Sequence, residues 1–167
     1  MSQLSIPTPL GECTLEFEGD VVTRFRLPAA CAAGEQHVEN DRATAPAWVR
    51  ELARRVRLHL EGAVQDFADV PFDWSRVSDF QHSVYATALT VKAGRTWSYG
   101  QVAKALGLPP GGARAVGVAL GQNPWPLLVP CHRFIGADGK MTGFSAPGGT
   151  KTKLKLLALE GAQLFAE

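Results

Sequence analysis

The run 123–130 constrains the fold of this chain more than any other stretch, because it contains three prolines. A proline lacks an amide hydrogen, fixes its own φ and disfavours helical backbone at the residue before it, so this run cannot be a helix. The sequence therefore predicts an extended, rigid segment that carries Cys131 and the adjacent His132 to a defined position.

Cys131, His132 and Arg133 follow one another directly, which places a thiol beside a base and a permanent cation in the sequence. A thiol becomes a nucleophile when such groups stabilise its thiolate. Adjacent side chains need not touch, however, and an arbitrary cysteine is more often a small buried residue than a reactive one. The motif alone leaves both interpretations open.

The charge balance of the 167-residue chain gives a net charge of only +1, so a polyanionic partner must be held by a local patch. The N-terminus lacks the charged and apolar regions of a signal peptide, and no apolar run approaches the length that spans a membrane. Cys13, Cys31 and Cys131 form an odd, widely spaced set, which argues against a disulfide framework. These features predict a soluble, cytoplasmic protein with no membrane partner.

Residues 1–75 predict a small domain of strands followed by a helix. Alternating apolar residues indicate strands over 4–27, with a hairpin turn at Gly19. Pro46 is expected to open a helix that runs to Leu60. The apolar side chains expected on its inner face recur every four residues, at Trp48, Leu52, Val56 and Leu60.

Three further helices are predicted over 80–91, 99–106 and 113–122. Ser78 and Ser98 stand at the N-cap positions of the first two, where a hydroxyl can accept a hydrogen bond from the helix. A turn rich in glycine and proline separates the last two helices. This order is typical of a helix-turn-helix.

The helix 113–122 is unusual for a DNA-reading helix, because Arg114 is its only charged residue. A major-groove recognition helix normally carries long polar side chains that read base edges. A helix of alanine, glycine and small aliphatic residues can instead approach a backbone or a shallow groove very closely. It can equally pack tightly against another helix, and spacing alone does not decide between the two.

The end of the chain predicts a short strand, a loop and a helix. Residues 134–135 are expected to extend the strand that carries the cysteine, and 143–149 form a glycine-rich loop. An amphipathic helix over 150–160 closes the chain, with its lysines mostly turned outward. The side chains expected to face inward are those of Leu154, Leu157 and Ala158.

Taken together, these segments resemble the O6-alkylguanine-DNA alkyltransferase family, also called methylated-DNA–protein-cysteine methyltransferases. The resemblance spans about 80–160, whereas residues 1–75 match only in general layout. The matching motifs agree in order and spacing and comprise residues 98–103, 114–117, 123–124, 130–133 and 156–161.

The resemblance implies an α+β fold in two domains. Residues 1–75 would form a small ribonuclease-H-like α/β domain. Residues 76–167 would form a mostly helical, winged-helix-like domain that carries the helix-turn-helix and the active site.

The resemblance also implies a reaction in which sulfur attacks a saturated alkyl carbon and guanine leaves. Cys131 would be the nucleophile and acceptor, and His132 would take its proton through a water molecule. Glu160 would hold and charge-stabilise that imidazole, as the third group does in a catalytic triad. Tyr99 would donate a hydrogen bond toward the purine ring as charge builds on it.

Five residues are implied in and around the substrate pocket of such a protein. The backbone at Ser145 would donate to O6, and the carbonyls of Val129 and Cys131 would accept from the exocyclic amine. Asn123 would brace the turn ahead of the cysteine, and Phe144 would form a wall of the pocket.

DNA binding is implied for the helix of small residues, which would enter the minor groove. Arg114 would fill the gap left when the damaged nucleotide rotates out of the stack, since a base inside a duplex cannot otherwise be reached. The other DNA-contacting residues implied are Ala113, Ala115, Gly117 and Tyr99.

The expected function is direct repair of O6-alkylguanine in double-stranded DNA by a monomer that acts once and needs no cofactor. No group looks able to cleave the resulting thioether. The sequence leaves open whether O4-alkylthymine is also a substrate.

Two rival functions and one metal site remain to be weighed. A lesion-binding relative that does not repair would have its cysteine replaced, whereas Cys131 is present. A cysteine hydrolase would leave the helix with Arg114 unexplained. A zinc set of Cys13, Cys31, His37 and His82 contains no compact Cys-x-x-Cys pair, so no metal is expected.

Overall fold

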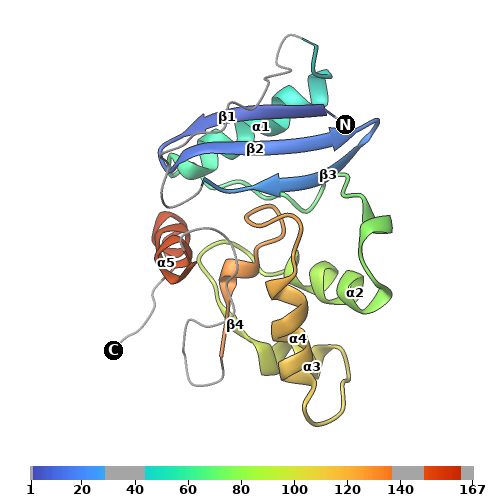
Figure 1. Ribbon diagram of the computed structural model, residues 1–167. Helices are drawn as coiled ribbons and strands as arrows, with labels where there is room; N and C mark the ends of the chain where they lie inside the picture. Colours follow the sequence, from blue (N-terminus) through green and yellow to red (C-terminus); the bar gives the residue numbers. More distant parts are fainter. Residues whose placement is uncertain (1, 29–43, 137–148, 163–167) are drawn as a thin grey trace.

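The computed structural model has an α+β architecture, with a three-stranded sheet and one helix above a group of short helices (Figure 1). It describes residues 2–28, 44–136 and 149–162. Over these ranges, no helix has the length and apolar character needed to cross a membrane.

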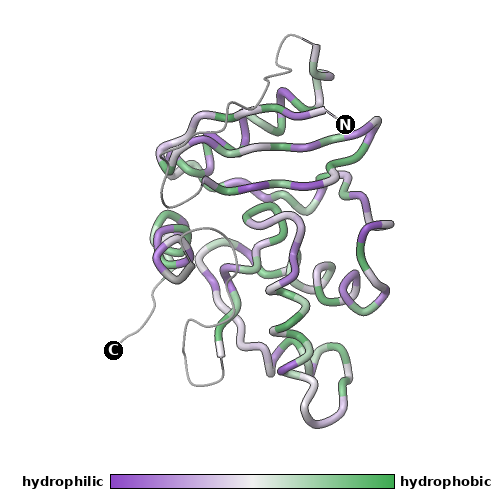
Figure 2. Tube along the Cα trace, in the orientation of Figure 1, coloured by the Kyte–Doolittle hydropathy of each residue, from purple (hydrophilic) through white to green (hydrophobic). Residues whose placement is uncertain are grey.

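The sheet is an antiparallel meander in the order β1-β2-β3, formed by Ser2–Thr8, Gly11–Glu18 and Val21–Arg26. The strands alternate between polar and apolar residues along their length (Figure 2), and most of the apolar ones are buried. Gly19 has a φ of 58° in the β2–β3 turn, a left-handed conformation that glycine adopts without strain. The predicted strands and hairpin are therefore confirmed.

Helix α1, Ala47–Leu60, covers one face of the sheet (Figure 1). Pro46 is its N-cap, as expected for a residue whose missing amide would have had no helical partner. Trp48 is only half-buried, whereas Val49 and His59 are buried beside the predicted inner residues. His59 is thus a polar residue on the packed face, which apolar periodicity could not reveal.

Three helices lie below the sheet: α2, Asp79–Ala88; α3, Tyr99–Ala105; and α4, Gly112–Gly121. Ser78 and Ser98 each accept from the amide three residues on, while the glutamine at that position reaches back, so both form complete capping boxes. Helix α2 ends three residues earlier than predicted, because the backbone at 89–91 closes into tighter i,i+3 turns.

The proline-rich run is a compact loop rather than the extended segment that was predicted. Leu127 has a φ of 79°, the amide of Val129 donates to the carbonyl of Trp125, and Pro126 pairs with Val129. Prolines exclude a helix, but they are equally compatible with consecutive turns. The loop can therefore fold back on itself before it reaches Cys131.

The cysteine motif is also not part of a strand. Cys131–Arg133 forms a single 3₁₀ turn, and only Phe134–Ile135 continues as β5, which pairs in parallel with β4, Trp97–Ser98. The turn bends the chain so that these three side chains all point into the protein interior, where each is buried.

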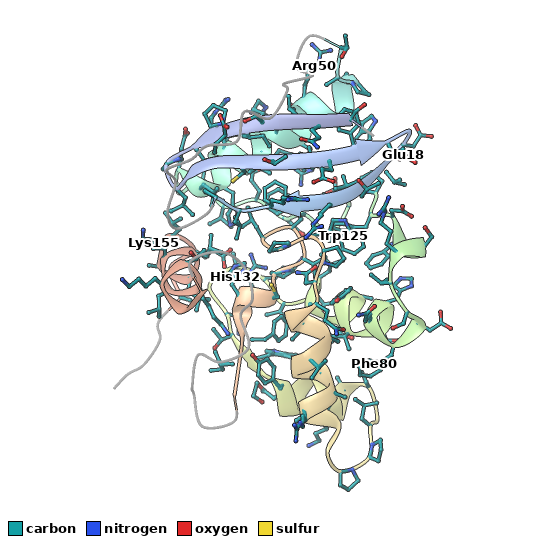
Figure 3. The ribbon with its side chains drawn as sticks, viewed as in Figure 1. Glu18, Arg50, Phe80, Trp125, His132 and Lys155 are labelled. Atoms are coloured by element: carbon teal, nitrogen blue, oxygen red, sulfur yellow. The ribbon has the colours of Figure 1, made fainter. Side chains whose placement is uncertain are left out.

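Trp125 joins the loop to the sheet. Its side chain is fully buried, and its indole N–H donates to the carbonyl of Val22 in β3 at 3.0 Å. The amide of Phe25 donates to the carbonyl of Pro124 at 3.0 Å. Figure 3 shows Trp125 at the level where the sheet meets the lower helices.

Helix α5, Gly149–Leu159, presents a different face to the core from the one predicted. Leu157 is buried as expected, but Leu154 is 41 % exposed and Ala158 is exposed. The buried stripe instead has the i, i+3, i+4, i+7 spacing of one helix face and comprises Lys153, Leu156, Leu157 and Glu160. Because Lys153 and Glu160 are charged, a search for apolar periodicity does not find this buried face of the helix.

Candidate active site

Cys131 lies at the start of the 3₁₀ turn and is only 7 % exposed. Asn123 holds the loop in front of it, because its amide nitrogen donates to the carbonyl of Val129 at 2.9 Å and its oxygen accepts from the amide of Trp125 at 2.9 Å. The bracing geometry expected of Asn123 is therefore present.

The carbonyl of Val129 already accepts two hydrogen bonds. One comes from Asn123 and the other from the backbone amide of Cys131 at 2.7 Å. A carbonyl oxygen has two lone pairs, so an exocyclic amine would have to displace one of these donors. The predicted contact between Val129 and substrate thus remains a prediction, and it competes with bonds that shape the loop.

His132 and Glu160 are brought together as predicted, although 28 residues separate them in sequence. Nε2 of His132 lies 2.8 Å from Oε2 of Glu160, and both side chains are fully buried. The position of His132 in the interior, between α5 and the lower helices, can be followed in Figure 3.

Arg133 binds the same carboxylate through two parallel hydrogen bonds. Its Nε donates to Oε1 and its terminal nitrogen to Oε2, both at 2.9 Å, and its other terminal nitrogen donates to the carbonyl of Val91 at 2.7 Å. Such a fork between guanidinium and carboxylate fixes the orientation of both groups. Arg133 therefore has a structural role in this site, which is to hold the Glu160 carboxylate in place.

The pKa of Glu160 lies well below its ordinary value. Burial alone would raise it, but the hydrogen bonds from His132, His59 and Arg133 outweigh that effect. Glu160 is therefore a permanent anion in the interior.

Nδ1 of His132 is buried and has no hydrogen-bond partner among the described residues. Because the carboxylate can only accept at Nε2, the proton of the neutral ring belongs on Nε2, and Nδ1 carries the lone pair. Burial also lowers the pKa of His132, ahead of the opposing effect of Glu160, so the resting ring is neutral. Nδ1 is thus an unpartnered, buried base in the same 3₁₀ turn as Cys131.

Cys131 rests as a thiol. Burial raises the pKa of the thiol, and the hydrogen bond from Asn123 and the charge of Lys153 only partly oppose this. Formation of the thiolate in this site therefore depends on a base that takes the proton.

Lys153 was missed from the sequence, where it was expected to face solvent. It is 1 % exposed, and its ammonium donates to the carbonyl of Phe134 at 2.6 Å. Burial lowers its pKa to about 8, although the Cys131 thiolate would raise it. It contributes a buried positive charge that favours the Cys131 thiolate. The only sequence signal for its burial is its position on the same helix face as Leu156, Leu157 and Glu160.

Tyr99 and the proposed DNA-contacting helix are packed together. A Cβ placed on Gly117 would lie 3.5 Å from two carbons of the Tyr99 ring, so the ring rests against the helix where a side chain is absent. Arg114 and Ala115 lie on the exposed side of α4, and Ala113 is half-buried. Val118, which the sequence did not single out, is 54 % exposed on the same side.

A cavity of about 780 Å³ has Cys131 in its lining, between β3 and the C-terminal end of α4. Its volume is in the range of small-molecule pockets. Two of its arginines are paired with carboxylates, Arg26 with Glu16 and Arg76 with Asp73.

Four of the residues considered from the sequence lie outside the described ranges: Cys31, His37, Phe144 and Ser145. Within those ranges, no group of three or more metal-binding side chains is gathered together. Cys13 is an unpaired, buried thiol in β2, and burial raises its pKa to about 12.

Removal of the charge on Glu160 should destabilise the protein strongly. In Glu160→Gln, Arg133 keeps its buried charge but loses the anion that compensates it, which typically costs about 3–5 kcal/mol. Urea unfolding would measure the change. The control Glu61→Gln removes an exposed carboxylate 3.9 Å from Arg57 and should change stability by less than about 1 kcal/mol. Equal effects of the two substitutions would contradict this view of the network.

Lys153 should make stability rise with pH. Its folded pKa of about 8 is below the ordinary 10.5, so between these values the unfolded chain binds more protons and stability increases. Relative to Lys153→Met, the wild type should gain about 3 kcal/mol across this window. Urea unfolding of both proteins at several pH values would measure it, because other titrating groups are common to both. A difference that does not change with pH would contradict the prediction.

The chain resembles known proteins over its whole length. The model of the 6-O-methylguanine DNA methyltransferase DNA-binding domain matches residues 79–162. The methylated-DNA–protein-cysteine methyltransferase of Mycobacterium bovis is 39% identical over 98% of this chain and 94% of that protein. A Thermus thermophilus DNA base-flipping protein is 38% identical over 94% of this chain and 98% of its own.

Solved structures agree with the sequence comparison. The crystal structure of Mycobacterium tuberculosis OGT in complex with DNA superimposes with a TM-score of 0.76 and 37% identity, over 95% of this chain and 92% of that one. Fold, motif order and the buried Cys131–His132–Glu160 arrangement point to one conclusion. The chain belongs to the 6-O-methylguanine DNA methyltransferase family.

Proposed function

We propose that this protein repairs DNA as a methylated-DNA–protein-cysteine methyltransferase, by moving the alkyl group of O6-alkylguanine in double-stranded DNA to Cys131. The observation that carries the proposal is a buried thiol in the same turn as His132, whose Nε2 is bonded to Glu160 and whose Nδ1 is an unpartnered base. The names of the similar proteins support the same activity.

The proton, bonds and electron pairs of this transfer can all be accounted for without a cofactor. The thiol proton passes through a water molecule to Nδ1 of His132, and the Glu160 anion stabilises the imidazolium. The sulfur lone pair forms a bond to the alkyl carbon as the bond from that carbon to O6 breaks. The electron pair remains on guanine, toward which Tyr99 is proposed to donate a hydrogen bond, and guanine finally regains the proton. The thioether is stable, so each chain acts once.

The exposed side of α4 is proposed to lie in the minor groove. It presents Arg114, Ala115 and Val118, and most of the helix is apolar (Figure 2). Small apolar residues permit close approach to the groove, and a long side chain can replace a base that has left the stack. Because the Tyr99 ring rests on Gly117, the same helix links the groove to the proposed pocket.

The finer features of the fold belong to this proposal. Residues 1–75 are proposed as a ribonuclease-H-like domain, supported by the sheet and α1, and 76–167 as a winged-helix-like domain. Helices α3 and α4, joined by a short turn, support the helix-turn-helix. We further propose that the protein is a cytoplasmic monomer, that Ser145 and Phe144 line the pocket, and that Val129 contacts the base. The presence of Cys131, with an unpartnered buried base in the same turn, favours transfer over lesion binding alone.

Intact-protein mass spectrometry after incubation with a duplex containing one O6-methylguanine tests the transfer directly. We expect the mass to rise by one methylene and to saturate at one per chain, with the modification mapped to Cys131. Cys131→Ala should stay unmodified, and Cys13→Ala should behave as wild type, because the Cys13 thiol is buried with a pKa of about 12. An unmodified wild type that still binds the lesion duplex would favour the lesion-binding function instead.

Arg114→Ala should slow transfer from duplex DNA but not from a free O6-alkylguanine base. A free base needs no rotation out of a stack, whereas unstacking costs a few kcal/mol, so we expect a loss of at least about tenfold that is confined to the duplex. Arg50→Ala is the matched control, since Arg50 is exposed on α1 at the opposite end of the molecule (Figure 3). Equal losses on both substrates would indicate that Arg114 does not act in flipping.

A further inference from the structure

His59 reaches the buried carboxylate from a distant part of the chain. It lies in the last turn of α1, precedes Glu160 by 101 residues and has a fully buried side chain. Its Nε2 is 2.8 Å from Oε2 of Glu160, the same oxygen that lies 2.8 Å from Nε2 of His132. One carboxylate oxygen therefore lies between two imidazoles.

The proton of His59 is placed by the backbone. The amide of Gln65 donates to Nδ1 of His59 at 2.9 Å, so Nδ1 carries the lone pair. The proton of the neutral ring then resides on Nε2, where it is donated to Glu160. The ring of Phe67 packs against the imidazole with centroids 5.4 Å apart, which further limits its orientation.

The Nε2–H group of His59 also affects the protonation of the His132 ring. Arg133 also donates to Oε2, so His59 and Arg133 together hold that oxygen at a fixed position against the His132 ring. A carboxylate oxygen at 2.8 Å from Nε2 of His132 is stable only if that nitrogen carries the proton, since two lone pairs would repel. Nδ1 of His132 therefore carries the lone pair and is the basic nitrogen of the ring.

We propose that His59 is a positioning residue for alkyl transfer, which fixes the Nε2–H tautomer of His132 through their shared oxygen on Glu160. The inference rests on the proposed function. It extends the active site beyond the matched residues 79–162 and gives the N-terminal part of the chain a role in the chemistry.

Two substitutions separate the bond to Glu160 from the rest of the site. In His59→Asn, the side-chain oxygen can replace Nδ1 as the acceptor for Gln65, but the side chain is too short to reach Glu160. In His59→Gln, the longer amide can place a donor where Nε2 lies. Phe67→Leu is the packing control, because it removes the neighbouring ring and leaves both hydrogen bonds of His59 in place.

The experiment is ¹⁵N NMR of the His132 ring in the full-length free protein, combined with single-turnover transfer from the lesion duplex and measurement of duplex affinity. For His59→Asn we expect mixed His132 tautomers and a transfer rate roughly 10–100-fold lower at unchanged affinity, by analogy with the loss on removing a group that orients a metal-binding histidine. His59→Gln should restore the single tautomer and most of the rate, and Phe67→Leu should resemble wild type.

Two results would overturn the proposal: a His59→Asn variant with wild-type tautomer and rate, or a Phe67→Leu variant that loses as much rate as His59→Asn. If His59→Asn does not fold, His59→Phe provides a second variant without the donor. Absence of transfer in the wild type would instead refute the proposed function. The tautomer comparison is made without DNA, so it still tests the role of His59 in that case.

Discussion

A single buried carboxylate organises the centre of this protein. Glu160 follows α5 and accepts hydrogen bonds from α1 through His59 and from the 3₁₀ turn through His132 and Arg133. Arg133 extends the network to the backbone at Val91. This anion is compensated by one permanent cation, Arg133, and by neutral donors, so the buried carboxylate is not left unpaired. Helix α1, the end of α5 and the 3₁₀ turn are thereby tied to the two oxygens of one carboxylate.

The remaining parts of the site depend on how the loop before Cys131 is held. Its shape follows from short hydrogen bonds made by Asn123 and from the left-handed backbone at Leu127. Trp125 anchors it to β3, so the sheet supports the cysteine although no strand of the sheet contains it. This support explains how a buried thiol can be held in a fixed place although its neighbours form only one helical turn.

The sequence predicted the elements of this fold better than the contacts between them. Capping residues such as Ser78 and Ser98 act locally, so both helix starts were predictable. The proline run was misread as extended because proline restricts local backbone but does not say whether successive turns close on themselves. Lys153 and His59 were missed because a buried polar residue is stabilised by a partner far away in sequence, which apolar periodicity cannot register. The pairing of His132 with Glu160 was reached only through the family resemblance.

The contact between α1 and Glu160 also bears on how such chains can recombine. If a chimera takes its first half from one relative and its second half from another, residue 59 and residue 160 arrive from different parents. A partner at position 59 without a suitable donor would leave the hybrid folded around an incompletely satisfied anion. The two halves are therefore not independent modules. A crossover between positions 59 and 160 has to preserve the hydrogen bond between these two residues.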